Sequence, residues 1–246
     1  RFEFKMPAIQ SLETAFYVSN KHHLTSSFTL NYGLRYSIFQ NIGRATVNLL
    51  NENYKVVGQR KYGKGEIYNT YQGLLPRLGM NYMLSDVHSI KASYSRTRQH
   101  LIIASNSNTG SPLDVWICAN PNIEPLKGDQ YTLGYFRNFL NNKVETSFEI
   151  YYKHMQNQVA FKEFAQPQFN PDMEEELRFG TGKAYGVELM LRKPNGRLSG
   201  WISYSLSRSL RKINDIQEES WFPSPYDRPH DLTLVAMYDF SRRVSV

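Results

Sequence analysis

The chain has 246 residues, of which 21% are charged, and its formal net charge at pH 7 is +7. Cys118 is the only cysteine, which excludes an internal disulfide and a cysteine-based metal site. No segment approaches the roughly 18 consecutive apolar residues that a transmembrane helix requires. No signal peptide is recognisable at Arg1, so we expect an exported protein of this sequence to have lost its N-terminal part.

Runs of alternating polarity predict nine strands and the start of a tenth. Between residues 28 and 38, for example, the even positions are apolar or aromatic, and the odd positions between them are polar or glycine. Side chains alternate across a strand, so each such run has one apolar and one polar face. The predicted strands are 9–19, 24–39, 71–84, 88–98, 129–140, 144–157, 183–193, 198–209 and 229–240, and residues 244–246 would begin the tenth.

The connections between these runs alternate between short and long. Tight turns are expected at 19–23, 85–87, 141–143, 194–197 and 241–243, and long connections at 40–70, 99–128, 158–182 and 210–228. Barrels of the bacterial outer membrane show this asymmetry, because their periplasmic turns are short and their extracellular loops are long. The pattern therefore predicts both a fold and an orientation.

Charged side chains keep to the polar register in the central stretch of the predicted strands. A Lys or Arg on the lipid face near the bilayer midplane costs about 2–4 kcal/mol, so this pattern favours a wet lumen on the polar side. The residues predicted to face the lumen are Arg35, Arg77, Lys91, Glu145, Glu149, Lys153, Glu188 and Arg192.

Strand length and aromatic content distinguish a membrane barrel from a soluble sandwich. The runs exceed the usual five or six residues of globular strands and suit the ~9–11 needed to cross a bilayer. Aromatic residues make up 14% of the chain, as girdles at the two membrane interfaces require. We therefore predict an all-β, antiparallel, up-and-down transmembrane β-barrel in the outer membrane, of which this chain forms a part.

Motifs that would indicate chemistry are incomplete. Residues 58–65 nearly spell a phosphate-binding loop but end in glycine, and residues 180–186 lack the helix of a dinucleotide site. The acidic residues at 172–176 lack the pattern of a calcium loop and are expected to be solvated. No catalytic triad is recognisable, the basic residues do not form a nucleic-acid motif, and the basic loops could meet anionic ligands or lipopolysaccharide. We expect no enzymatic activity, metal, cofactor or nucleic-acid partner.

Three motifs identify a family resemblance. Asn120-Pro121-Asn122-Ile123-Glu124-Pro125, followed by Asp129 to Tyr135, is similar to the "NP-x-L-x-PE…YELGY" segment of TonB-dependent outer-membrane receptors, with Leu126 where Glu is usual. Residues 184–189 resemble their "A-x-G-x-E" strand opening, and residues 226–232 resemble their "DRPH" segment. The order and spacing of these motifs resemble the form of the family common among Bacteroidetes.

The resemblance implies a barrel of 22 strands that encloses a plug domain. Residues 1–246 would be the C-terminal portion of that barrel, with the plug, the TonB-contacting box and the final strands outside the sequence. The implied partners are outer-membrane lipid, the protein's own plug, the TonB complex and a surface lipoprotein. The charged lumenal residues would hold the plug through breakable polar contacts.

The function implied is that of a receptor whose loops capture a nutrient for import to the periplasm. Siderophore, cobalamin, glycan and peptide all stay open as substrates. Two alternatives are a passive porin-like or structural barrel and a soluble β-rich adhesin module. The residues expected to contact ligand at the barrel mouth are Arg60, Tyr62, Arg96, Arg98, His100, Trp116, Arg178 and Trp221.

Overall fold

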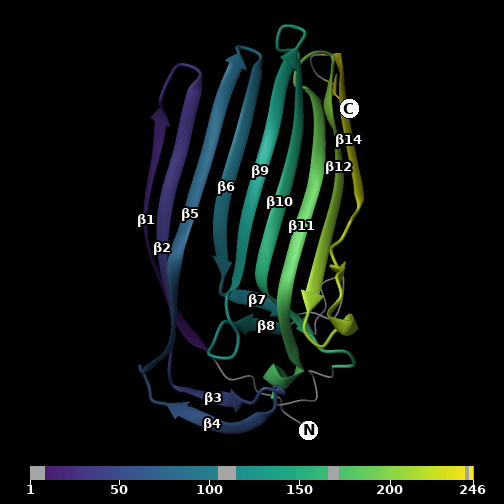
Figure 1. Ribbon diagram of the computed structural model, residues 1–246. Coiled ribbons are helices and arrows are strands. Elements are labelled where there is room, and N and C mark those ends of the chain that lie inside the picture. The colour runs from purple at the N-terminus through teal and green to yellow at the C-terminus, as the bar shows by residue number, and fades with distance from the viewer. Residues whose placement is uncertain (1–8, 105–114, 166–171, 242–243, 246) are drawn as a thin grey trace.

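A computed structural model describes residues 9–104, 115–165, 172–241 and 244–245. Its main element is one antiparallel sheet in which strands that follow one another along the chain also lie side by side (Figure 1). This confirms the predicted all-β, up-and-down class. The order is β1 (Gln10–His23), β2 (Phe28–Ile42), β5 (Ile67–Ser85), β6 (His88–Gln99), β9 (Leu126–Phe139), β10 (Val144–Phe161), β11 (Leu177–Lys193), β12 (Leu198–Ile213), β14 (His230–Ser241) and β15 (Val244–Ser245).

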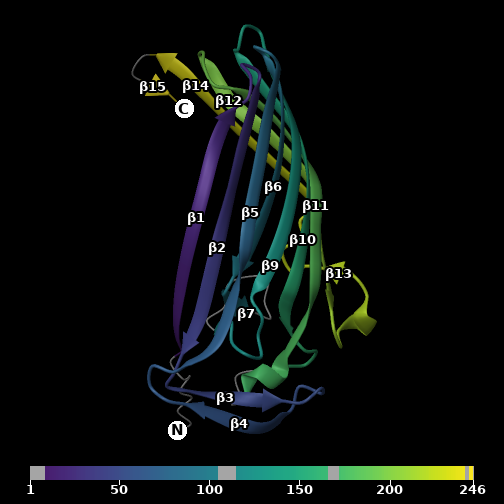
Figure 2. The same ribbon diagram turned by 60° about the vertical axis from the view of Figure 1, so that its left-hand side comes forward.

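The short and long connections lie at opposite ends of this sheet (Figures 1 and 2). The long ones were predicted as loops, and this is wrong in part because several carry strands and short helices of their own. Hydrogen-bond pairing within each connection makes these elements, which are too short to show a clear period. They are β3 (Ala45–Leu50), β4 (Val56–Tyr62), β7 (Leu101–Ala104), β8 (Val115–Cys118), η1 (Met173–Glu176), η2 (Gln217–Glu219) and β13 (Phe222–Pro223).

The first turn lies later than predicted. Residues 19–23 continue β1, whose register runs to the pair His23 and Thr29, and the chain reverses at residues 24–27. The Thr25 hydroxyl accepts the backbone N–H groups of Ser27 and Phe28 at 3.2 and 3.0 Å, which closes this turn. The polar residues at 19–23 resemble a turn in composition, but they form the paired, water-facing end of a strand.

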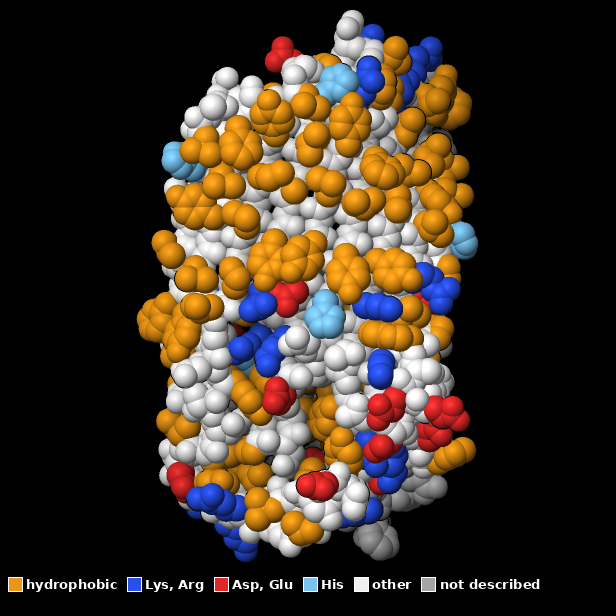
Figure 3. Space-filling view, in the orientation of Figure 1, with side chains coloured by type: hydrophobic (Ala, Val, Ile, Leu, Met, Phe, Trp, Pro, Cys, Tyr) orange, Lys and Arg blue, Asp and Glu red, His pale blue; other side chains and the backbone are white. Residues whose placement is uncertain are grey.

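The register separates an apolar face from a polar face over the whole sheet. On the apolar face, large side chains such as Leu34, Leu78, Leu133 and Leu232 are between 41% and 67% exposed. Figure 3 shows apolar side chains in successive tiers across the short-turn half of the molecule. Soluble monomers rarely expose so much contiguous apolar surface. No second large sheet covers these residues within the described ranges, which rules out the sandwich alternative.

Among the described residues, none of the helices has the length and apolar character needed to cross a membrane.

Close backbone approach fixes the positions of several glycines in the sheet. A Cβ added to Gly180 in β11 would lie 2.0 Å from the carbonyl oxygen of Lys212 in β12. A Cβ added to Gly79 in β5 would meet nothing nearer than 3.9 Å. The neighbouring residues therefore leave room for a methyl group at Gly79 but not at Gly180.

We predict that Gly180→Ala lowers the free energy of unfolding of the intact receptor by about 1–3 kcal/mol, because backbone must move to admit the methyl group. Gly79→Ala, the matched control, should change it by less than about 0.5 kcal/mol. Urea unfolding in detergent micelles measures both. Equal effects of the two substitutions would contradict the close packing of β11 on β12.

Candidate ligand-binding site at the loop end

A small apolar core holds two of the long connections, 99–128 and 158–182, together beyond the end of the sheet. It consists of Ile102 and Ile117 from the β7–β8 hairpin, Ile123 from the following turn, Phe161 at the end of β10 and Leu177 at the start of β11. Each is at most 8% exposed. Burial of side chains this large contributes about 1.5–3 kcal/mol each. The connections thus form a packed platform.

The motif at Asn120–Pro125 forms a tight turn inside this platform. The Asn120 side-chain oxygen accepts the backbone N–H groups of Asn122 and Ile123, at 2.8 and 3.1 Å. The Tyr71 hydroxyl donates to the Asn120 carbonyl at 2.8 Å, which anchors the turn to β5. Ile123 is consequently driven into the core, where it is 1% exposed.

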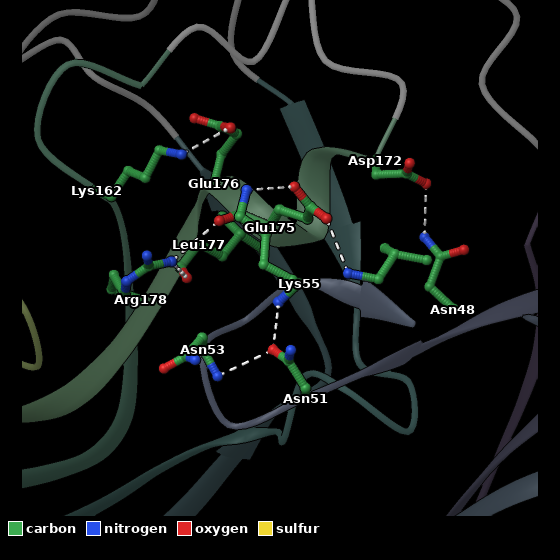
Figure 4. A network of polar contacts seen from close by, with 11 residues as sticks. Asn48, Asn51, Asn53, Lys55, Lys162, Asp172, Glu175, Glu176, Leu177 and Arg178 are labelled. Atoms are coloured by element: carbon green, nitrogen blue, oxygen red, sulfur yellow. Dashed lines mark hydrogen bonds and ion pairs between the residues drawn. The ribbon is translucent and has the colours of Figure 1, made fainter. Parts of the chain in front are cut away.

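The acidic segment at 172–176 ties three connections to one another (Figure 4). The Glu175 carboxylate accepts hydrogen bonds from the Lys55 ammonium at 2.9 Å and from the Val56 backbone N–H at 2.8 Å, and both donors belong to the β3–β4 hairpin. Lys162, next to the end of β10, pairs with Glu176 at 3.0 Å. The expectation that this segment is merely solvated is wrong, since Glu176 is only 6% exposed.

Glu174 joins the same segment to the Asn120 turn. Its two carboxylate oxygens accept the side-chain amides of Asn120 at 2.8 Å and Asn122 at 2.7 Å. The Asn122 amide also donates to the Asn48 carbonyl of β3 at 2.9 Å. Burial raises the pKa of Glu174, an effect that the two asparagine hydrogen bonds oppose.

A cavity of about 650 Å³ opens between the β3–β4 hairpin, the β7–β8 hairpin and η1. Its wall is mainly apolar and aromatic, with one cation, Arg44, and one anion, Glu174. Ligand pockets are typically of this size and combine an apolar lining with few polar groups. The residues used below are Arg44, Asn48, Tyr68, Trp116, Asn120 and Glu174.

Three of the residues predicted to contact ligand lie at or next to this cavity. Trp116 lines it and is 60% exposed. The Tyr62 ring stacks on that of Tyr68, which also lines it, with centroids 5.0 Å apart. The Arg60 guanidinium lies over the Tyr62 ring at 5.3 Å. These side chains form a continuous path from the β4 strand to the cavity wall.

Two other predicted contact residues are used in packing instead. His100 is 7% exposed and stacks on Phe39, with ring centroids 4.3 Å apart. Arg178 lies over the Tyr54 ring at 4.3 Å and donates to Asp215 at 2.9 Å, and its side chain is 12% exposed. Both hold connections to the sheet, so little of either is accessible to a ligand.

The remaining three lie away from the cavity. Arg96 pairs with Asp129 on the apolar face of the sheet at 2.8 Å. The Arg98 guanidinium lies beside Gly73, where an added Cβ would come within about 3 Å of it. Trp221, 42% exposed, carries the Lys183 ammonium over its ring at 4.1 Å. None of the three lines the cavity.

The eight residues predicted to face the lumen share one face of the sheet. The register pairs Glu145 with Arg192 and Glu149 with Glu188, and Lys153 follows them along the same face of β10. Glu145 and Arg192 approach to 3.5 Å. The remaining members are Arg35, Arg77 and Lys91.

Sequence reasoning missed the residues that build the cavity from within the connections. Asn48, Tyr68, Asn120 and Glu174 come from four separate segments. The family motif around Asn120 was the one local signal. Within the described residues, no group of His, Cys, Asp and Glu side chains is arranged to hold a metal ion.

An antiparallel wall with an exposed apolar face and all its long connections at one end defines an outer-membrane β-barrel protein. The sequence matches the family model "TonB dependent receptor-like, beta-barrel" over residues 6–238. The chain therefore belongs to the TonB-dependent receptor β-barrel family and to the outer membrane.

Solved structures of such receptors show the same fold. The FrpB iron transporter of Neisseria meningitidis gives a TM-score of 0.61 at 14% identity, over 96% of this chain and 32% of that one. The pyoverdine receptor FpvA of Pseudomonas aeruginosa gives a TM-score of 0.61 at 17% identity, over 95% of this chain and 29% of that one. The alcaligin receptor FauA of Bordetella pertussis gives a TM-score of 0.59 at 16% identity, over 94% of this chain and 34% of that one. No curated protein sequence matches the chain. The chain spans about a third of the length of these neighbours.

Glu175 predicts how the platform responds to acid. The Val56 N–H, and after it Lys55, lower the pKa of this carboxyl. A lowered folded-state pKa gives a contribution to stability that is present above the unfolded value of about 4.3 and is lost as the pH falls through the folded value. Burial raises the pKa of Glu174, so the contribution of this carboxyl to stability has the opposite pH dependence and becomes more favourable as the pH falls.

We therefore predict that the hydrogen-exchange protection of the Val56 amide falls when the intact receptor is acidified below about pH 4. In Glu175→Gln this protection should already be lower at pH 7 and should vary little with acid. The Tyr54 amide, which donates to Asn51 within the same hairpin at 3.0 Å, is the internal control. Acid-independent protection of Val56 in the wild-type receptor would contradict the prediction.

Proposed function

We propose that the chain is the ligand-gathering part of an outer-membrane receptor that imports a nutrient to the periplasm and performs no chemistry on it. The observation that carries this proposal is the cavity at the loop end, held by a packed platform and lined by Trp116 and Tyr68. An ordered cavity at the loop end suits capture of a scarce solute, because little ordering entropy is lost when the ligand binds.

The cavity favours an amphipathic ligand with aromatic or apolar surface. Trp116 and Tyr68 offer ring faces, while Arg44 and Glu174 offer one charge of each sign. Rigid aromatic anchors with a few polar groups are typical of binding hot spots. A siderophore, cobalamin, a glycan and a peptide all fit these terms. The 14–17% identity to the solved receptors supports the fold and does not transfer their ligands.

The polar face supports the second part of the proposal, a plug held inside the completed barrel. Glu13 and Arg35 pair at 3.5 Å, and the Lys91 ammonium lies over the Phe136 ring at 4.0 Å. Exposed pairs of this kind contribute about 0.2–1 kcal/mol each, so contacts to a plug can form and break. We further propose that the plug and the TonB complex, and a surface lipoprotein, are the partners, and that the parent protein is of the Bacteroidetes type.

We predict that Trp116→Ala weakens nutrient binding by about tenfold or more, as the loss of a large aromatic anchor does. Ferric siderophores, cobalamin, oligosaccharides and peptides would be titrated into the intact receptor by calorimetry, and the ligand found would then be tested on the variant. Trp221→Ala, which removes an exposed tryptophan outside the cavity, should bind normally. If both variants bound equally well, the cavity would not be the binding site.

We predict that neutralising Glu145 and Glu149 together by Gln loosens the plug and raises the sensitivity of cells to a large antibiotic such as vancomycin. Glu52→Gln with Glu66→Gln, which removes two exposed charges from the β3–β4 hairpin region, is the control. A passive porin, the alternative function, would leak in the wild type and respond to neither change. Unchanged leak in the Glu145/Glu149 variant would count against plug seating on this face.

A further inference from the structure

The cavity at the loop end is bordered by the open edge of a strand. Within the part of the chain that the structure describes, β3 pairs with β4 alone. Figures 1 and 2 show β4 on the outside of this hairpin and β3 on the side nearer the main sheet. Every residue from Arg44 to Asn48 lines the cavity. Because side chains alternate across a strand, this consecutive run indicates that the edge of β3, and not one of its faces, borders the cavity.

The backbone groups on this edge are available for pairing. The Asn48 carbonyl accepts the side-chain amide of Asn122, which lies outside the hairpin, at 2.9 Å. Residues two apart on an antiparallel strand direct their N–H and C=O groups to the same side, so Thr46 presents both of its groups to the side of the cavity. Among the described residues, no hydrogen bond from outside the hairpin reaches residues 44–47. Such an edge is a template for a further strand.

The two charged groups of the cavity lie at opposite ends of this edge. Arg44 stands at the start of β3, and no carboxylate lies within 4.0 Å of it in the described ranges. Glu174 lies at the other end, because the Asn122 amide that bonds the Asn48 carbonyl also donates to a Glu174 oxygen at 2.7 Å.

Glu174 can still accept a further donor. Each of its oxygens accepts one asparagine amide, from Asn120 and Asn122, whereas an ionised carboxylate has about four acceptor positions. A chain that begins beside Glu174 and ends beside Arg44 runs antiparallel to β3.

We propose that the solute bound in this cavity is a short peptide with free termini, which adds to β3 as an antiparallel strand; this inference rests on the function proposed above. The peptide backbone pairs with Thr46. Its terminal carboxylate meets Arg44 and its terminal ammonium meets Glu174, while Trp116 and Tyr68 contact its side chains. In strand addition of this kind, main-chain hydrogen bonds give affinity and side-chain pockets give specificity.

The open edge distinguishes a peptide from the other candidate nutrients. Alternating N–H and C=O groups along an extended chain are a property of the peptide backbone. Cobalamin and glycans lack such a ladder, and so does a siderophore that is not built on a peptide. Strands rise about 3.3 Å per residue, so residues 44–48 match a peptide of about five residues.

The test uses the intact receptor, purified in detergent. Pools of random pentapeptides with free termini are titrated into it by calorimetry, and the strongest binder is resynthesised with one backbone N-methyl group at each position in turn. Methylation should weaken binding about tenfold where the N–H faces β3 and little at the positions between, because alternate residues of a strand face its partner. Amidation of the peptide's C-terminus should weaken binding to the wild type but not to Arg44→Gln.

A proline on each edge of the hairpin tests the same pairing from the side of the receptor. Thr46→Pro removes the N–H that faces the cavity and leaves the pairing with β4 intact, so it should weaken peptide binding about tenfold. Lys61→Pro changes the cross-strand partner of Thr46 and places the same ring on the outer edge, where it should leave binding unchanged. Hydrogen exchange of the Val56 amide checks that the hairpin is intact in both variants.

Three results would each overturn the inference: no pentapeptide binds, methylation acts equally at all positions, or Thr46→Pro binds as well as Lys61→Pro. The methylation series needs no variant, so it decides the question even if a proline variant fails to fold. The proposed function is judged separately. It would stand without the peptide if a ferric siderophore, cobalamin or an oligosaccharide bound the wild type and bound Trp116→Ala more weakly.

Discussion

The whole molecule depends on the pairing of backbone groups between neighbouring strands at a fixed register. In a bilayer no water replaces a missing hydrogen bond, so the sheet must satisfy its own N–H and C=O groups. Because side chains alternate along each strand, the same register decides which residues meet lipid. A slip of one residue would transfer Leu78 or Leu133 to the polar face and Lys91 or Glu149 to the lipid. Each strand pairing is therefore fixed both by the lipid on one face of the sheet and by the water on the other.

Beyond the membrane this constraint ends, and a different arrangement takes over. Strand β10 ends at Phe161 and β11 begins at Leu177, and these two residues belong to the apolar core at the loop end, which the sheet alone could not close. Hydrogen bonds from one short acidic segment then fasten the neighbouring hairpin to that core. The loop end is thereby ordered enough to keep a cavity open, and most of the lining of that cavity comes from the connections, with Ser11 of β1 and Tyr68 of β5 added from the sheet.

The sequence could predict the parts that obey a local rule. The long strands of the main sheet and their two faces follow from a period of two, which is legible within any ten residues. The contacts of Glu174 with Asn120 and Asn122 join segments more than fifty positions apart, and no local pattern encodes them. His100 and Arg178 were expected at the surface because charge and position suggested it. Their burial depends on Phe39 and Tyr54, which only the folded chain brings near.

The family motifs acquire a physical meaning in the structure. The Asn120 side chain closes a buried turn, and the Asp227 carboxylate of the motif at 226–232 accepts a hydrogen bond from the Ser209 backbone N–H at 2.6 Å. Both motifs thus attach a connection to the end of a strand. They mark the boundary between barrel and loops.

The segment from Asp172 to Glu176 makes the structures of several long connections depend on one another. Its successive side chains engage Asn48 and Lys55 of the β3–β4 hairpin, Asn120 of the connection that carries β7 and β8, and Lys162 of its own connection. A change of sequence that remodels one of these connections would therefore remove hydrogen-bond partners from the others. Grafting a single loop from a relative in place of the Asn120 turn, for example, would leave the buried Glu174 carboxylate without its two asparagine donors.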